Sequence, residues 1–170
     1  MGELKPKKVS DSAVNDHIYK VFPNDLNSYD TVFGGLVMAT LDRVALVVAE
    51  RHSGRTCVTA SVDALHFLVP AKRGDILIFK GAINRVWRTS MEVGLKVLSQ
   101  HYSTGELKHI CSAYFTFVAM DESGQSVEVP GIIPETSLEK RRYEEAEIRR
   151  NRRKQEKEEK LIRREKWKSL

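Results

Sequence analysis

The feature that most constrains this fold is a long near-apolar run, Phe33–Ala49, inside a segment, Phe33–Arg51, with few polar interruptions. Its length suits a helix of about five turns. Thr40, Asp42 and Arg43 interrupt the run, and a membrane span needs about 20 predominantly apolar residues, so a membrane span is not expected. A helix that is apolar on most of its faces has to be buried. We therefore expect other elements of the chain to wrap this helix.

Strand-like segments lie on both sides of the helix. An extended segment is expected before it, over Val14–Val21. The segments after it are rich in β-branched residues or alternate between apolar and polar residues, as half-buried strands do. They are Thr56–Val69, Asp75–Arg88, Met91–His101 and Lys108–Met120. Short joins favour antiparallel neighbours. This order predicts an α+β fold in which one antiparallel sheet curls around one long central helix.

The C-terminal segment differs in charge from the rest. Residues 137–170 hold 14 Lys/Arg and 8 Asp/Glu, a net charge of +6, whereas residues 1–136 hold 14 and 15, a net charge of −1. The basic character therefore belongs to this segment, and nucleic-acid binding by the folded part is not expected.

The C-terminal segment opens with a capping-box sequence at Thr136–Glu139, and it has no apolar residue between Arg149 and Lys160. We interpret it as a solvated helix or a partly disordered tail; contact with RNA or a membrane is the alternative. Truncation near Ser137 should then preserve fold and activity. The expected divisions are an N-terminal lead (1–12), a folded domain (13–135) and a charged tail (136–170).

Metal and thiol chemistry find little support in the sequence. The five histidines are scattered without metal-ligand spacing, and Cys57 and Cys111 belong to no paired motif. Both cysteines are expected to be small core residues in a reducing, cytoplasmic environment. The N-terminal residues lack the apolar core of a signal peptide. No metal and no redox cofactor is expected.

The helix begins with a glycine pair, Gly34-Gly35, after Phe33. Glycines allow another molecule to approach the backbone closely. The first amides of a helix have no internal partner and lie at the positive end of its dipole, so they are able to hold a developing oxyanion. The alternative is that the glycines only pack the helix start against a strand.

Asp42 is an isolated acid in this apolar helix. A buried charge is costly, so its presence indicates a role. It lies seven residues after Gly35, on nearly the same face. We interpret it as a functional carboxylate, either a general base for water or a nucleophile. The alternative is an ion pair with Arg43 or another surface cation.

A third candidate site is the tight turn Arg88-Thr89-Ser90 between two predicted strands. A guanidinium, two hydroxyls and turn amides are suited to holding phosphate. An ordinary hairpin turn is the alternative interpretation.

Several motifs in one order resemble the acyl-CoA thioesterase family with the hot-dog fold, over about residues 14–135. They are Asn27–Met38 followed by Leu41-Asp42, Val58–Asp63, Phe67–Pro70 with Gly74-Asp75, Arg88–Val93 and Phe115–Ala119. The resemblance implies a curled sheet around the helix and hydrolysis of fatty acyl-CoA by water. It also implies a homodimer as the minimal unit, with a hexamer, a trimer of dimers, expected.

The resemblance also implies roles for residues. Asp42 matches the catalytic aspartate, and Gly35 lies at the oxyanion-binding start of the helix. The substrate-binding residues are expected to be Asn27, Gly34, Arg88, Thr89 and Ser90, of which the last three would meet the nucleotide portion of CoA. Thr31 stands where some relatives have a catalytic Asn. Asp30 stands where Gly is common, and Asp tolerates a positive φ better than most residues.

These observations predict an acyl-CoA thioesterase that needs no cofactor, because CoA is part of its substrate. The alternative is a non-catalytic acyl-CoA or CoA-binding sensor or scaffold on the same fold. An RNA-associated protein acting through its tail would instead bind in a strongly salt-dependent way.

Overall fold

The computed structural model describes residues 4–168. The elements follow in the order β1 (Lys7–Lys8), β2 (Val14–Lys20), α1 (Gly34–Ser53), β3 (Thr56–Val62), β4 (Ile76–Val86), β5 (Ser90–Gln100), β6 (Leu107–Met120), β7 (Ile132–Ile133) and α2 (Ser137–Lys168). Short 3-10 helices span Val9–Asp11 and Pro23–Asp25. The predicted order of one helix and five main strands is confirmed.

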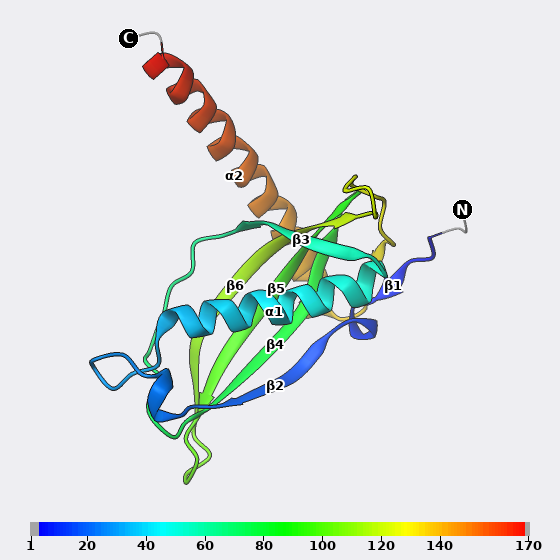
Figure 1. The fold of residues 1–170 in the computed structure, drawn as a ribbon. Coiled ribbons are helices and arrows are strands. Elements are labelled where there is room, and N and C mark those ends of the chain that lie inside the picture. Colours follow the sequence, from blue (N-terminus) through cyan, green and yellow to red (C-terminus); the bar gives the residue numbers. More distant parts are fainter. Residues whose placement is uncertain (1–3, 169–170) are drawn as a thin grey trace.

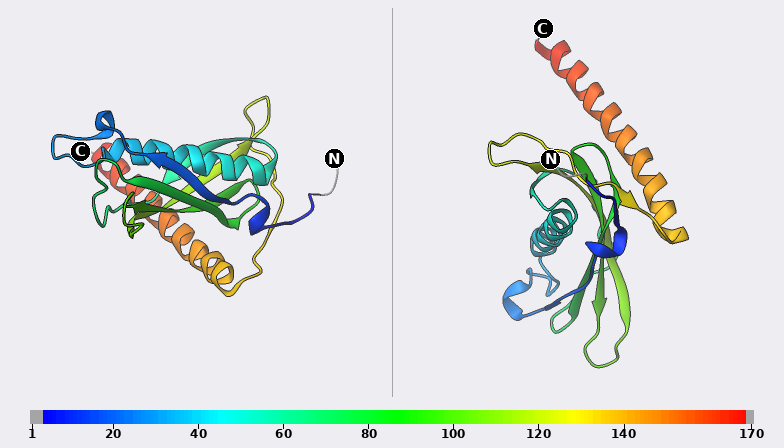
Figure 2. Two further views of the ribbon diagram at one scale, coloured as in Figure 1. Left: turned by 90° about the horizontal axis from the view of Figure 1, so that it is seen from below. Right: turned by 90° about the vertical axis from the view of Figure 1, so that its right-hand side faces the viewer.

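The main sheet is antiparallel and runs in the order β2-β4-β5-β6-β3. Helix α1 lies across one face of this sheet, and α2 starts against the opposite face (Figures 1 and 2). Strands β1 and β7 form a separate two-stranded parallel ribbon. Because β3 pairs only with β6 in this sheet, its other side is an open edge beside α1.

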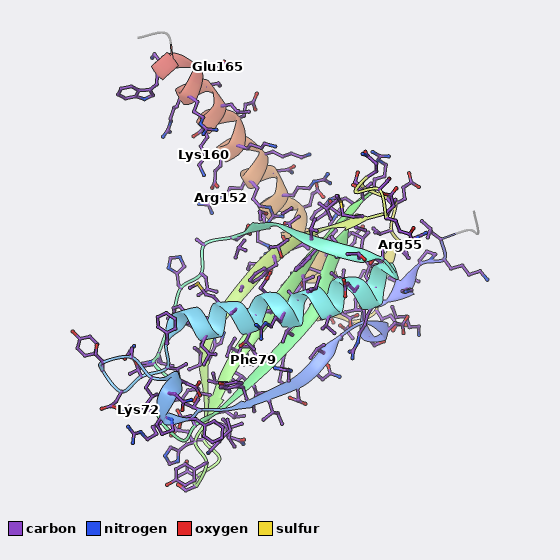
Figure 3. The ribbon with its side chains drawn as sticks, in the orientation of Figure 1. Arg55, Lys72, Phe79, Arg152, Lys160 and Glu165 are labelled. Atoms are coloured by element: carbon purple, nitrogen blue, oxygen red, sulfur yellow. The ribbon has the colours of Figure 1, made fainter. Side chains whose placement is uncertain are left out.

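The core lies between α1 and the inner face of the sheet. Helix α1 contributes Val37, Leu41, Val44 and Val48, whose spacing places them on one face of a helix, and each is at most 4% exposed. Phe79 on β4, labelled in Figure 3, is fully buried in the same cluster. Packing of this buried face against the sheet fixes the position of α1 relative to the strands.

The opposite face of α1 is not covered within one chain. Met38 and Val47 are 48% and 41% exposed, and Val58 and Val62 on the edge strand β3 are 45% and 49% exposed. The expectation that the chain's own sheet would bury most faces of the helix is therefore wrong, because the sheet covers one side only. Exposed apolar surface of this extent is typical of an interaction site.

The predicted strand Thr56–Val69 is shorter than expected. Strand β3 ends at Val62, opposite Phe115 of β6, and residues 63–70 form no regular element. Two backbone bonds still tie this segment to β6: the Asp63 amide donates to the Tyr114 carbonyl at 3.0 Å, and the Leu68 amide to the Ile110 carbonyl at 2.8 Å. The apolar residues that suggested a longer strand pack at the start of α1 instead.

The C-terminal segment is helical, and its capping box is confirmed. The Glu139 amide donates to Thr136 Oγ1 at 3.2 Å, and the Thr136 amide donates to Glu139 Oε2 at 2.9 Å. The interpretation as a wholly solvated tail is wrong for the first half of α2, where Ala146 is fully buried. The side chains of Arg149 and Arg153 are only 19% exposed, because they meet acids of the sheet.

The second half of α2 does project away from the sheet (Figure 1). Arg152, Lys160 and Glu165, labelled in Figure 3, are exposed side chains along this helix. Within residues 4–168, no helix is both long enough and apolar enough to cross a membrane.

Candidate active site

The carboxylate of Asp42 is held by a neighbouring strand. Thr59 Oγ1 on β3 donates a hydrogen bond to Asp42 Oδ1 at 2.7 Å. Asp42 is half-buried on the side of α1 that the sheet does not cover. In the described part of the chain it forms no ion pair with Arg43, because consecutive helical residues point in different directions. One carboxylate oxygen is therefore fixed by Thr59, and the arrangement leaves Oδ2 for another donor.

Thr59 was missed in the sequence, where it is one of several β-branched residues in a strand-like run. Only its pairing with Asp42 distinguishes it, and that pairing depends on how β3 lies beside α1. A threonine at a strand edge carries no local sequence signal for such a role.

The loop before α1 is closed around the side chain of Asn27. Its Oδ1 accepts the Tyr29 amide at 2.9 Å and the Thr31 amide at 3.3 Å, and its Nδ2 donates to Thr31 Oγ1 at 2.9 Å. Asp30 has φ +56°, which makes it the one non-glycine residue with positive φ among residues 4–168. The Asp at this position thus takes up the left-handed conformation that favours glycine. Asn27 and Thr31 are brought together and hold each other.

A pocket of about 360 Å³ opens beside this loop. It is lined mainly by apolar side chains together with two polar ones and a helix-start glycine: Asn27, Thr31, Val32, Gly34, Val37, Phe67, Leu68, Val69, Pro70, Ala71 and Ile110. An apolar pocket with few polar groups is the usual form of a small-molecule site, and this volume lies in the usual range.

The two glycines at the start of α1 have different surroundings. Gly34 lines the pocket, and a Cβ there would lie 3.5 Å from the Phe67 ring, an ordinary contact. A Cβ at Gly35 would lie 2.4 Å from the ring of Phe33, which is 59% exposed and free to shift. No side chain caps this helix end. The first amides of α1 therefore remain available to an external acceptor.

The Arg88-Thr89-Ser90 turn joins β4 to β5. The Trp87 amide donates to the Ser90 carbonyl at 2.8 Å, and the Thr89 carbonyl accepts the Ala119 amide at 3.1 Å. Arg88 is exposed and lies 3.8 Å from Glu128 in a loose ion pair. The turn is thus an ordinary hairpin in its backbone, with one guanidinium that is still able to bind an anion.

A second, larger hollow of about 790 Å³ lies between α2 and the end of β3. Its lining includes Ser90, Tyr114 and cations of α2. The buried cations, Arg149 and Arg153, are already paired with carboxylates. Arg150 is half-buried with its guanidinium 4.4 Å from the centre of the Trp87 ring, and Arg152 pairs with Glu156. The lysines of the lining are exposed. Apart from Arg150, this hollow therefore offers an incoming anion only cations that are exposed or already paired with carboxylates.

Neither cysteine is suited to act as a nucleophile. Burial raises the pKa of the Cys111 thiol to about 11 and also raises the pKa of the Cys57 thiol. The reactive form is the thiolate, which such a shift suppresses. Within residues 4–168, no group of three or more His, Cys, Asp or Glu side chains has the geometry to hold a metal ion.

The predicted site residues form three separate groups within one chain. Asn27, Thr31 and Gly34 meet at the pocket, Asp42 meets Thr59 further along α1, and Arg88–Ser90 lies at the β4–β5 turn. Gly35 and Asp42 are seven residues apart, which is about 10 Å along the helix axis. One chain does not bring the helix-start amides and the carboxylate to the same point.

Comparison with known proteins places this arrangement in a family. A model described as the thioesterase superfamily matches residues 29–104. The acyl-CoA thioester hydrolase YkhA of Bacillus subtilis, itself uncharacterized, is 40% identical over 138 residues, covering 81% of this chain and 80% of YkhA.

Solved structures share the whole fold. A hexameric acyl-CoA thioesterase without ligand has a TM-score of 0.87 at 38% identity, covering 89% of this chain and 97% of that one. An acyl-CoA hydrolase of Staphylococcus aureus in complex with butyryl coenzyme A has a TM-score of 0.84 at 37% identity, covering 90% and 93%. Mutants of the same enzyme, with an aspartate, an asparagine or a threonine replaced by alanine, are similar as well.

Proposed function

Since the chain belongs to the acyl-CoA thioester hydrolases of the thioesterase superfamily, we propose that it hydrolyses fatty acyl-CoA to a free fatty acid and CoA. The observation that carries this proposal is the Asp42 carboxylate, held by Thr59 on the face of α1 that the sheet leaves open. A protein that only binds CoA has no need of an acid in this position. The Staphylococcus aureus mutants alter the same residue types as Asp42, Asn27 and Thr59.

In the proposed mechanism, Asp42 acts as a general base. Its Oδ1 is fixed by Thr59, so Oδ2 accepts a proton from a water molecule. The water oxygen attacks the thioester carbonyl carbon, and the carbonyl oxygen becomes an oxyanion. Collapse of this intermediate breaks the carbon–sulfur bond, and the departing thiolate takes up the proton held by Asp42. The products are the fatty acid and CoA.

The start of α1 is proposed to bind the oxyanion. The amide of Gly35, uncapped and at the positive end of the helix dipole, is the donor. The adjoining pocket of about 360 Å³ receives the acyl chain, because most of its lining is apolar. Asn27 and Thr31 lie at its edge, where Thr31 is proposed to assist catalysis and Asn27 to contact the substrate.

The active unit is proposed to be a homodimer, because one chain separates Gly35 from Asp42. The exposed side chains of Met38 and Val47 and the open edge of β3 offer the surface for such pairing. Pairing two copies across a two-fold axis sets the helix start of one beside the aspartate of the other. A hexamer, built as a trimer of dimers, is the proposed complete assembly, and the similar thioesterase of known structure is itself hexameric.

The nucleotide end of CoA is proposed to bind at Arg88, Thr89 and Ser90. Arg88 is exposed and its ion pair with Glu128 is loose, so little is lost when it turns to a phosphate. The proposed catalytic domain spans residues 13–135, with the docked half of α2 as its outer cover. A cytoplasmic location is proposed, in keeping with two buried free cysteines.

The test is a thiol-release assay over acyl-CoAs of increasing chain length. Hydrolysis should appear without added metal and should be lost in Asp42→Asn. Saturable binding of acyl-CoA without release of thiol by the wild-type protein would instead identify the sensor or scaffold.

A further inference from the structure

We propose that Arg153 of α2 is a positioning residue for the acyl pocket. It holds the irregular segment of residues 63–71, called here the pocket wall, against the sheet. This inference rests on the proposed function, because it gives the C-terminal helix a part in substrate selection. The basis is a chain of contacts from the buried centre of the outer sheet face to the loop that carries Thr31.

The contacts begin at Glu92, near the start of β5. Glu92 is fully buried. Asn84 Nδ2 donates to its Oε1 at 3.0 Å, and Arg149 Nη2 donates to the same oxygen at 2.7 Å. Arg149 also lies 3.8 Å from the centre of the Tyr114 ring. A buried carboxylate without such partners is costly, so Glu92 fixes this part of α2 onto the sheet.

Arg153, one turn further along α2, joins this anchor to the pocket wall. Its Nη2 donates to Glu92 Oε2 at 3.0 Å, while its Nη1 donates to Asp63 Oδ2 at 2.7 Å and Oδ1 at 3.0 Å. The Arg153 and Asp63 side chains are each 19% exposed. A planar guanidinium that binds two carboxylates fixes both their distance and their orientation.

Asp63 is the first residue of the pocket wall. From Asp63 to Leu68, only the amides of these two residues form backbone hydrogen bonds to the sheet; the described backbone between them forms none. The wall then runs past Phe67, Leu68, Val69 and Pro70, all of which line the pocket. At its far end the Ala71 carbonyl accepts the Val32 amide at 2.9 Å, and Lys72 pairs with Thr31. The wall therefore spans from α2 to the loop that carries Thr31.

A segment with so few backbone bonds depends on its ends. When Arg153 releases Asp63, the start of the wall keeps only the backbone bond from the Asp63 amide to the Tyr114 carbonyl and loses its side-chain anchor. Phe67 and its neighbours then sample more positions, and a long acyl chain loses a defined surface. Displacement of about 1 Å by a distant substitution is able to reduce a rate about 10²-fold. An acetyl group does not reach along the wall, so its hydrolysis depends far less on Arg153.

The experiment compares three variants of the full-length protein. Arg153→Gln removes the bridge and leaves Arg149 on Glu92. Asp63→Asn leaves both arginines on Glu92 and weakens only the link to the wall. It therefore still tests the inference if Arg153→Gln fails to fold. Arg152→Gln is the matched control, because Arg152 is 80% exposed and pairs only with Glu156 in the described residues. Hydrogen–deuterium exchange of the Asp63 and Leu68 amides, which bond to the sheet at the start and in the middle of the wall, is measured without substrate. The kcat/KM values for acetyl-CoA and a long acyl-CoA are measured as well.

Arg153→Gln and Asp63→Asn should each speed exchange of these wall amides, and Asp63→Asn should leave exchange of β5 unchanged because both arginines stay on Glu92. Each should lower kcat/KM for the long substrate about 10- to 100-fold. Acetyl-CoA should be affected much less, and Arg152→Gln should match the wild type. Unchanged exchange in folded Asp63→Asn, or equal losses for both substrates, overturns the inference. If the wild type hydrolyses no thioester, the proposed function fails, and the exchange data still decide whether Arg153 holds the wall.

Discussion

Thr59 and Asp42 belong to different elements, yet a 2.7 Å hydrogen bond joins the hydroxyl of the edge strand to the carboxylate of the central helix. This bond fixes one oxygen of the proposed general base. It also makes the orientation of the base depend on the position of β3. Asp42 is therefore expected to accept the proton, and Thr59 to orient Asp42.

Asp42→Asn should fold normally and lose most thioesterase activity. The amide keeps the size of the carboxylate and still accepts from Thr59, but it does not take a proton from water. General acid–base groups contribute about 10²–10⁴-fold, and we expect a kcat loss in that range. Circular dichroism establishes the fold, and thiol release gives kcat. Glu50→Gln on the same helix is the control; near-normal kcat in Asp42→Asn would exclude the assignment.

Thr59→Val should cost less than Asp42→Asn. Valine keeps the β-branched shape and removes the hydroxyl, so the carboxylate remains but is no longer oriented. One hydrogen bond to a charged group is worth about 1.5–3 kcal/mol, which corresponds to a loss of about 10- to 150-fold in kcat if it acts wholly on the base. Thr59→Ser restores the donor and should recover most of the activity. Equal damage from Ser and Val would show that Thr59 serves packing.

The helix, the order of the elements along the chain and the capping box were predictable because each depends on local pattern. The ends of β3 and the docking of α2 were not. Leu65, Phe67 and Leu68 are as apolar as strand residues, but Leu65 packs against the core, and Phe67 and Leu68 line the pocket. In β5 the alternation sets Glu92 on the face opposite Met91, which normally means solvent. Here that face is covered by a helix whose own charges pair with it.

The residues of the candidate site were likewise only partly predictable from the sequence. Asp42 could be singled out because an acid inside the near-apolar run Phe33–Ala49 is costly to bury. Thr59 and Arg153 could not, since each gains its role only from a residue distant in the chain. Those two partners are Asp42 and Asp63, 17 and 90 residues away.

Two truncations should separate the docked half of α2 from the projecting half. A chain ending at residue 158 keeps Arg149 and Arg153 on Glu92, so its Tm should stay close to that of the full chain. A chain ending at residue 136 loses both partners. Removing the partner of a buried charge costs about 3–5 kcal/mol, or roughly 10 °C in Tm for a domain of this size. Equal Tm values for the two truncations, measured by calorimetry, would mean that the docked half adds nothing.

Acidification should destabilise the protein through His52. This side chain is fully buried and lies 2.8 Å from the Pro130 carbonyl, and burial lowers its pKa below the ordinary 6.5, with Lys7 acting in the same direction. Above about pH 6.5, His52 is neutral in both the folded and the unfolded chain, so its protonation does not oppose folding in that range. As the pH falls below about 6.5, the unfolded chain binds a proton that the folded chain resists, and stability is lost.

Urea unfolding between pH of about 7.5 and about 5 measures this effect. His52→Gln should show a shallower fall in unfolding free energy across the range, because glutamine does not titrate. His66→Gln, which replaces an exposed histidine, should keep the wild-type slope. If the slopes of wild type and His52→Gln coincide, another group governs the acid sensitivity.

The last prediction is that each active site is built from two chains. Along α1 the Gly35 amide and the Asp42 carboxylate are about 10 Å apart. An oxyanion donor and a base that serve one carbonyl both have to lie within about 3 Å of the reacting group or its water. When two copies of α1 lie antiparallel across a two-fold axis, the Gly35 amide of each chain lies beside the Asp42 carboxylate of the other. The dimer then has two equivalent sites that satisfy both distance requirements. Complementation tests this arrangement with Asp42→Ala and Gly35→Val, each of which should assemble and be inactive.

The two variants are given different affinity tags, unfolded together and refolded, and the mixed dimers are isolated by both tags. A mixed dimer carries one doubly altered site and one site in which Gly35 of one chain faces Asp42 of the other. Because the symmetry makes the two sites equivalent, we expect about half of the wild-type activity per dimer. Folded variants mixed without unfolding are the control and should stay inactive. Mixed dimers that form and remain inactive would place both groups within one chain.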